Sequence, residues 1–185
     1  MRVVGTALEG VKIIEPRVHA DSRGDFLETY SARRYREQVA IELPFVQDNV
    51  SRSGRDVLRG LHLQLRRPQG KLIQVLEGSA YDVVVDLRAG SATFGRHIGV
   101  ALSETNRRQL WVPPGFAHGF CVTGEVALLH YKCTDYYDPQ DESGLAWNCP
   151  VLNIDWPVQS PVLSEKDARY PGLKDWLACH KRAVL

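Results

Sequence analysis

Short runs of alternating apolar and polar residues, separated by turn-forming clusters, follow one another along most of this 185-residue chain. In the clearest run, residues 80–87, Tyr81 and Val83 fall on one face of a strand and Asp82 on the other. Further strands are expected at residues 11–14, 26–30, 45–50, 57–63, 71–76, 97–102, 109–112, 116–122 and 126–133. Many short strands at close intervals favour an all-β, mainly antiparallel sandwich or barrel over βαβ units.

Turns and a few short helices account for the other segments. Turns are expected at residues 21–24, 51–54, 77–78, 88–91 and 122–125. Short helices are expected at residues 32–39, 165–169 and 173–179. Ser31 and Ser164 stand where the N-caps of the first two helices should be. Because no repeat, linker or low-complexity segment is found, residues 1–185 are predicted to form one domain, with C-terminal helices from about residue 164.

Charge and composition exclude several classes of protein. Lys and Arg number 23 and Asp and Glu 22, so the net charge is 23 − 22 = +1, and no overall positive field favours nucleic acid as a partner. Hydrophobic residues make up 44% of the chain, which is enough to bury a core. The longest uncharged stretch, residues 109–124, is too short to cross a membrane and contains Pro113 and Pro114.

The N-terminus and the cysteines indicate a cytoplasmic protein. Glu9 interrupts the first residues before an apolar run reaches the length of a signal peptide. The four cysteines show no CxxC spacing and are too sparse for a disulfide framework. We therefore expect reduced thiols in the cytosol.

Polar residues on an otherwise apolar strand provide the first indication of function. Strict alternation along residues 57–64 places His62 and Gln64 on one face of the strand and Arg59 on the other. A single strand histidine is more often a core residue than a ligand or a base. Lys71 at the start of the next strand and His118 further along favour a functional cluster instead.

Two kinds of chemistry fit this cluster. A metal site would need imidazoles converging from one face, but Gln64 stands in place of a second histidine and the Lys71 ammonium disfavours a divalent cation. The second kind of chemistry is the metal-free removal of a proton next to a ketone, for which histidine is a suitable base. A carboxylate would orient that base, Lys71 would stabilise the enolate, and a tyrosine such as Tyr131 would return the proton from the opposite face.

The same residues lie within a series of motifs that covers most of the chain. In order, the motifs are VLRGLHLQ (57–64), QGKLI (69–73), DVVVDLR (82–88), TFG (93–95), RQLWVPPGFAHGF (108–120), YKCT (131–134) and IDWP (154–157). The series resembles the dTDP-4-dehydrorhamnose 3,5-epimerases, and the similarity extends from residues 15–17 to residues 163–167. So many motifs in one order and at compatible spacing do not arise by chance.

The resemblance implies a cupin-type jelly-roll β-sandwich that forms a homodimer, with the N-terminal strands packed on the partner. It implies inversion at C3 and C5 of dTDP-4-dehydro-6-deoxy-D-glucose, a dTDP-4-keto-6-deoxyhexose, to give dTDP-4-dehydro-L-rhamnose. No metal and no organic cofactor takes part in this family. Because both carbons flank the C4 ketone, one enolate-stabilising group serves both steps.

The resemblance also implies roles for individual residues. His62 matches the base, Lys71 the group that stabilises the enolate and Tyr131 the acid. Asp167 matches the carboxylate that orients the base, although by itself it reads as an exposed carboxylate in a first helical turn. Tyr137 is a rival for the acid role or a platform for the thymine ring. The other substrate contacts implied are Arg23, Phe26, Glu28, Gln47, Asn49, Arg59, His118, Glu142 and Lys166.

Departures from the family pattern leave alternatives open. The segment from His62 to Lys71 is one residue shorter than in several relatives, which could move Lys71 along its strand. Leu63 replaces a frequent aromatic residue and is expected to point away from His62. A 3- or 5-mono-epimerase for another deoxysugar would keep the same base and acid. A metal-dependent cupin enzyme and a catalytically silent sugar-nucleotide-binding module are two further classes.

Overall fold

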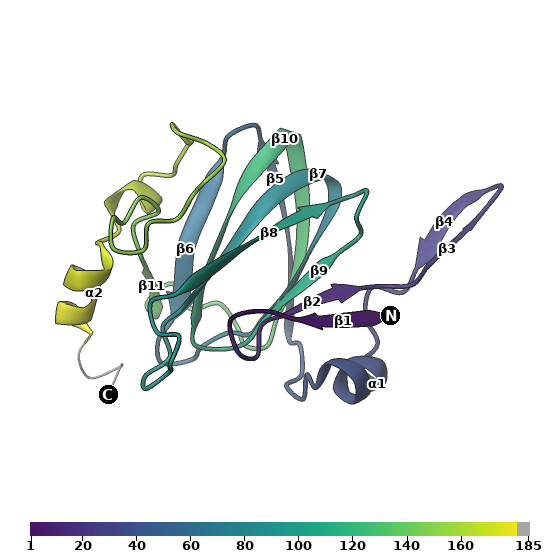
Figure 1. Cartoon of the computed structure of the whole chain (residues 1–185), viewed down its shortest axis with the longest axis horizontal. Coiled ribbons are helices and arrows are strands. Elements are labelled where there is room, and N and C mark those ends of the chain that lie inside the picture. Colours follow the sequence, from purple (N-terminus) through teal and green to yellow (C-terminus); the bar gives the residue numbers. More distant parts are fainter. Residues whose placement is uncertain (181–185) are drawn as a thin grey trace.

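The computed structural model of the chain describes residues 1–180 and consists mainly of antiparallel sheet, so the predicted all-β class with a few short helices is confirmed (Figure 1). The strands are β1 (Arg2–Gly5), β2 (Lys12–Glu15), β3 (Val18–Asp21), β4 (Gly24–Leu27), β5 (Gln47–Gly54), β6 (Leu58–Gln64), β7 (Lys71–Asp86), β8 (His97–Ser103), β9 (Gln109–Val112), β10 (Phe116–Cys133) and β11 (Glu142–Gly144). The helical segments are α1 (Ala32–Arg34), a π-helical turn (Tyr35–Val39), a 3₁₀ turn (Asp167–Arg169) and α2 (Leu173–Cys179).

The two longest strands, β7 and β10, pair with each other along almost their whole length. Each also pairs with two other strands: β7 with β9 near its start and β8 near its end, and β10 with β6 near its start and β5 near its end. The β7–β10 pair therefore passes from one layer of the curled sheet to the other (Figure 1). Strands β1 and β2 continue the sheet beyond β9, and β11 continues it beyond β6.

Irregular pairing in the middle of β7 and β10 corrects two predicted turns. Residues 77–78 and 122–125 lie inside these strands, where the ladder shifts register. Gly78 has a φ of +77°, and a Cβ at this position would collide with the Val126 carbonyl. The glycine therefore marks a bulge and not a chain reversal. The predicted turn at residues 51–54 is also wrong, because β5 continues through it.

The helical segments match the predictions in part. Residues 32–39 are helical as expected, but Ser31 makes no side-chain cap hydrogen bond. Ser164 Oγ does accept the backbone N–H of Asp167 at 3.1 Å, although the turn that follows is only Asp167–Arg169. Helix α2 coincides with the predicted segment. None of the helices within residues 1–180 is long and apolar enough to cross a membrane.

Buried apolar side chains form three clusters. The first lies between the layers of the sheet and includes Ile73 and Leu129. The second includes Leu61 and Trp176 and joins the outer face of the sheet to the C-terminal segment and α2. The third includes Tyr35 and lies under α1. The C-terminal segment is thus attached to the sheet by core packing, which matters for the site described below.

Strands β3 and β4 form a separate two-stranded ribbon that projects away from the body (Figure 1). Almost all of its residues are exposed, and Phe26 is 71% exposed. Strands β1, β3 and β11 were not predicted, because runs of three or four residues are too short to show a clear period.

We expect Trp176→Ala to destabilise the fold by about 3–5 kcal/mol, because it leaves a cavity under α2. The indole is 1% exposed and its Nε1 donates a hydrogen bond to Ser143 Oγ at 2.9 Å. Urea denaturation measures the change. Lys174→Ala, on the exposed side of the same helix, is the control and should stay within about 0.5 kcal/mol of the original protein. Equal stability of the two variants would contradict the anchoring role of α2.

Candidate active site

A cavity of about 300 Å³ lies where the core between the two layers opens to solvent. Its floor is apolar and consists of Ile73, Phe120 and Leu129 from the first core cluster. Ten of the predicted site residues line it: Gln47, Asn49, Arg59, His62, Lys71, His118, Tyr131, Tyr137, Glu142 and Lys166. The fold thus brings together most of the polar residues that the motifs singled out.

His62, on β6, is held by a carboxylate from the far end of the chain. Its Nε2 lies 2.5 Å from Asp167 Oδ1. The Asp167 side chain is only 4% exposed, so the interpretation of this residue as an exposed helix carboxylate is wrong. Burial alone would raise the pKa of Asp167, but the hydrogen bond and charge of His62, together with Ser164 and Lys166, outweigh it and lower the pKa. The result is an imidazole fixed in orientation by a buried anion.

Strand β6 departs from strict alternation at this point. Arg59 and His62 both line the cavity, although an odd spacing would place them on opposite faces. The ladder between β6 and β10 shifts register by one residue between them, as His118 pairs with His62 while Phe120 pairs with Arg59. The shift turns both side chains to the same side. Leu63, expected to point away from His62, also borders the cavity.

Lys71, the first residue of β7, supplies a positive charge inside the cavity. Within the described residues its ammonium makes no salt bridge, and desolvation lowers its pKa. Its partner in the β10 ladder is Cys133, a cavity residue that the sequence did not single out. Glu142 and Asp82 act on this cation only from a distance, so it is available to an anionic oxygen of a ligand.

Tyr131 lies on β10 in the wall of the same cavity. It pairs with Asn49 on one side and Ile73 on the other. Burial raises the pKa of its hydroxyl, so the group stays protonated at neutral pH. Ser51 Oγ, also in the wall, is buried and has no hydrogen-bond partner among the described residues.

His118 forms a second histidine–carboxylate pair in the cavity wall. Its Nε2 lies 2.8 Å and 3.0 Å from the two carboxylate oxygens of Asp82, which is fully buried. The alternation of residues 80–87 predicted a polar face for Asp82 but no partner for it. The two residues meet because β7 and β10 are neighbours in the sheet.

Glu142 is the centre of a cluster at the edge of the cavity. Its Oε1 accepts hydrogen bonds from Lys166 Nζ at 2.5 Å and from Tyr170 Oη at 2.6 Å. Burial would raise the pKa of Glu142, but these donors and Tyr137 outweigh it and lower the pKa to about 2. The same interaction raises the pKa of Tyr137 to about 12. Tyr170 was not predicted from the sequence.

Three predicted substrate contacts lie outside the cavity of their own chain. Arg23, Phe26 and Glu28 are on or next to the projecting ribbon. Arg23 pairs with Asp21 at 2.7 Å, and Glu28 pairs with Arg34 at 3.2 Å, all at exposed positions. A single copy of the chain does not bring these three residues to the other ten.

Comparison with known proteins identifies the family of this chain. The family model for dTDP-4-dehydrorhamnose 3,5-epimerase matches residues 5–175. The chain belongs to this family. The resemblance found in the motifs is therefore confirmed, and the family can now be used to interpret the site.

Individual relatives match nearly all of this chain. The dTDP-4-dehydrorhamnose 3,5-epimerase of Pseudomonas aeruginosa is 49% identical over 95% of this chain and 97% of its own. That of Neisseria gonorrhoeae is 49% identical over 100% of this chain, which spans only about half (55%) of its length. A crystal structure of the Legionella pneumophila dTDP-6-deoxy-D-glucose-3,5-epimerase in complex with dTDP-4-keto-L-rhamnose superposes with a TM-score of 0.91 at 50% identity, covering 94% of this chain and 93% of that one.

Among residues 1–180, no group of three or more His, Cys, Asp or Glu side chains is arranged to hold a metal ion. Gln64, which stood in place of a second histidine, has a structural role. Its Nε2 donates to the Arg67 carbonyl at 2.8 Å, and its Oε1 accepts the Asp138 N–H at 2.9 Å.

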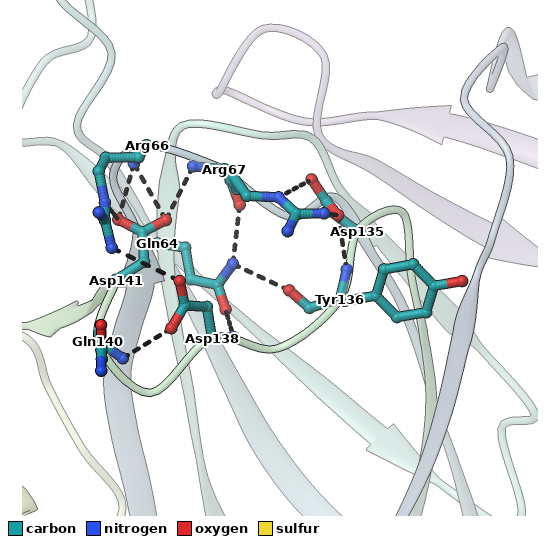
Figure 2. A network of polar contacts seen from close by, with 8 residues as sticks. All are labelled: Gln64, Arg66, Arg67, Asp135, Tyr136, Asp138, Gln140 and Asp141. Atoms are coloured by element: carbon teal, nitrogen blue, oxygen red, sulfur yellow. Dashed lines mark hydrogen bonds and ion pairs between the residues drawn. The ribbon is translucent and has the colours of Figure 1, made fainter.

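A polar network joins two loops that border the cavity (Figure 2). Asp141, 4% exposed, accepts the backbone N–H groups of Arg66 and Arg67 at 2.8–3.1 Å. One of these loops leads to Lys71 and the other to Glu142. The contacts hold the short segment before Lys71 in a defined conformation, and Lys71 lines the cavity.

We expect Asp141→Asn to lower the free energy of unfolding by about 1–3 kcal/mol at pH 6, since it weakens hydrogen bonds to a buried carboxylate. Hydrogen bonds hold the pKa of Asp141 below its usual value despite burial. A depressed pKa contributes stability above the unfolded value of about 4, and this is lost as the pH falls through the folded value. The difference between the two proteins should therefore shrink in urea titrations below about pH 4.

Glu125→Gln is the control, because it removes a carboxylate from an exposed pair with Arg55. It should cost at most about 1 kcal/mol. An Asp141→Asn effect as small as that of the control, or independent of pH, would contradict the role of the network.

Proposed function

We propose that this chain inverts C3 and C5 of dTDP-4-dehydro-6-deoxy-D-glucose to give dTDP-4-dehydro-L-rhamnose, as part of dTDP-L-rhamnose synthesis. The observation that carries the proposal is that His62, hydrogen-bonded to Asp167, lines one cavity with Lys71 and Tyr131. The family, and the Legionella structure with its dTDP-4-keto-L-rhamnose, support it. Both carbons neighbour the C4 ketone, so one base and one cation can serve both inversions.

His62 is the proposed base. Since its Nε2 is bonded to Asp167, Nδ1 is the ring nitrogen that takes the proton from C3 or C5. The electrons of the broken C–H bond form a C–C double bond, and the C4 carbonyl becomes an enolate. Asp167 holds the ring in place and stabilises the imidazolium that results.

Lys71 is the proposed partner of the enolate oxygen. Its ammonium has no salt bridge within the described residues, and its lowered pKa makes it a stronger donor to a developing oxyanion. Because the lysine places a positive charge beside the C4 oxygen, the proposed reaction uses no metal ion and no organic cofactor.

Tyr131 is the proposed acid that returns the proton on the opposite face. Its hydroxyl is protonated at neutral pH, as an acid must be. Tyr137 interacts with Glu142 through its hydroxyl and is half exposed, which suits a platform beside the thymine ring better than proton donation.

The remaining residues are proposed to hold the nucleotide. Arg59 and Lys166 would bind the diphosphate, with the other substrate contacts supplied by Gln47, Asn49, His118 and Glu142. In a homodimer, the projecting ribbon of one subunit would bring Arg23, Phe26 and Glu28 to the cavity of the other; the exposed Phe26 ring supports this. We place the reaction in the cytoplasm and assign it to a single domain spanning residues 1–185.

The test is NMR of dTDP-4-dehydro-6-deoxy-D-glucose incubated with the protein in D₂O without added metal. Deuterium at both C3 and C5, with a product accepted by a rhamnose-forming reductase, is the expected result. Deuterium at one carbon would identify a mono-epimerase instead. No deuterium at either carbon would overturn the proposal.

We expect His62→Ala to abolish deuterium incorporation at both carbons, a loss of at least about 10²–10⁴ in rate, because the base is removed. Tyr131→Phe should keep part of the incorporation and lose inversion, since the acid acts after the enolate has formed. His97→Gln, outside the cavity, is the control. Equal loss of incorporation in both site variants would contradict the assigned roles.

We expect Lys71→Met to lower kcat by about 10²–10³ while the Kd for dTDP stays within about twofold, because the charge acts on the sugar enolate and not on the nucleotide. Calorimetry with dTDP and the D₂O assay measure the two quantities. Lys174→Met, at an exposed position, is the matched control. A kcat within tenfold of the original protein would show that another group stabilises the enolate.

A further inference from the structure

Tyr170 contacts two parts of the site at once and has no role in the mechanism above. It lies just after the 3₁₀ turn that carries Asp167. We infer that Tyr170 is a positioning residue of the active site: its hydroxyl fixes the Glu142–Lys166 pair for substrate binding, and its ring fixes His62 for proton transfer. The inference rests on the proposed function, because substrate binding and proton transfer here refer to that reaction.

The hydroxyl contact joins Tyr170 to the binding part of the cavity. Tyr170 Oη donates to Glu142 Oε1 at 2.6 Å, and Lys166 Nζ donates to the same oxygen at 2.5 Å. Burial and the Glu142 carboxylate both raise the pKa of Tyr170, so its hydroxyl remains a donor at neutral pH. Without this hydroxyl, the Glu142 carboxylate loses a short hydrogen bond and can rotate together with the lysine that it holds.

The ring contact joins Tyr170 to the catalytic part. The Tyr170 and His62 rings meet edge to face, with centroids 5.7 Å apart and planes at 66°. The ring also fills the space above Gly144, where a Cβ would lie 2.6 Å from two ring carbons. Gly144 is the β11 partner of His62. The tyrosine ring therefore packs against both the base and the strand beside it, and limits the rotation of the imidazole away from Asp167.

Tyr170 lies in the segment that carries Lys166 and Asp167, and this segment has little regular structure to hold it in place. Lys166 reaches the cavity, and Asp167 reaches His62, from an irregular segment with only the one-turn Asp167–Arg169 helix for support. The carbonyl of Pro171, which follows Tyr170, accepts the backbone N–H of Ala146 at 2.8 Å. Tyr170 and this bond fasten the segment to β11 and the loop after it, so the carboxylate that orients the base is held at a constant distance.

The experiment separates the hydroxyl from the ring. Tyr170→Phe keeps the ring and removes the hydroxyl, so KM and the Kd for dTDP should rise about fivefold to tenfold with kcat within about twofold. Tyr170→Ala removes both, and kcat should fall by about 10²-fold as well, because the base is no longer held in place. Tyr136→Phe is the control: it removes an exposed tyrosine hydroxyl near the same loops and should leave all three quantities unchanged.

Two results would overturn the inference. One is a Tyr170→Phe variant with the KM and Kd of the original protein. The other is a Tyr170→Ala variant whose kcat falls only as far as its folded fraction, measured by circular dichroism. If the original protein exchanges no deuterium at C3 or C5, the proposed function fails, and the Kd for dTDP of Tyr170→Phe still decides the role of the hydroxyl.

Discussion

The hydrogen-bonded ladder between β7 and β10 links the other strands of the main sheet. This ladder carries Lys71 and Tyr131 near one end and Asp82 and His118 near the other. Because the two strands pass from one layer to the other, their side chains face a common interior along with those of β5 and β6. Apolar burial between the layers stabilises the ladder, and the cavity is the place where that core meets solvent. The proposed catalytic groups thus stand mostly on strands, which hold their positions better than loops do.

Charge in the cavity is organised in local pairs, although the chain as a whole is nearly neutral. The two histidines each have a buried carboxylate partner, Asp167 for His62 and Asp82 for His118. Lys71 differs from them, since within the described residues its ammonium makes no salt bridge. An enolate bound at this point would provide the missing negative charge, so the site is better matched to the charged intermediate than to the neutral ketone. The two carboxylates hold the two imidazoles in place, and in the proposed reaction Lys71 is left for the enolate.

The sequence predictions succeeded for features set by residues close together in the chain. They failed for features set by pairing with another strand. Alternation of side chains every two residues located most of the strands. It failed at Arg59 and His62, because the register shift that turns both to the cavity belongs to the pairing of β6 with β10. Gly78 predicts a turn from the sequence, because glycine is equally common in turns and bulges. The pairing of β7 with β10 shows that it lies in a bulge. Tyr170 carried no signal in the sequence, because its partners Glu142 and His62 are distant along the chain.

The amino-acid sequence is enough to predict an antiparallel β protein and to propose a histidine base, a lysine cation and a tyrosine acid for carbon-acid chemistry. Its motifs also identified the family, which the comparisons confirm. The folded chain is needed to show that Asp167 is buried against His62, 105 residues away, and that Lys166 and Tyr170 both donate to one oxygen of Glu142. The physical reason is that residue type and periodicity are local properties. The pairing of a base with its carboxylate depends instead on how the C-terminal segment packs on the sheet, through core contacts that form only when the whole chain folds.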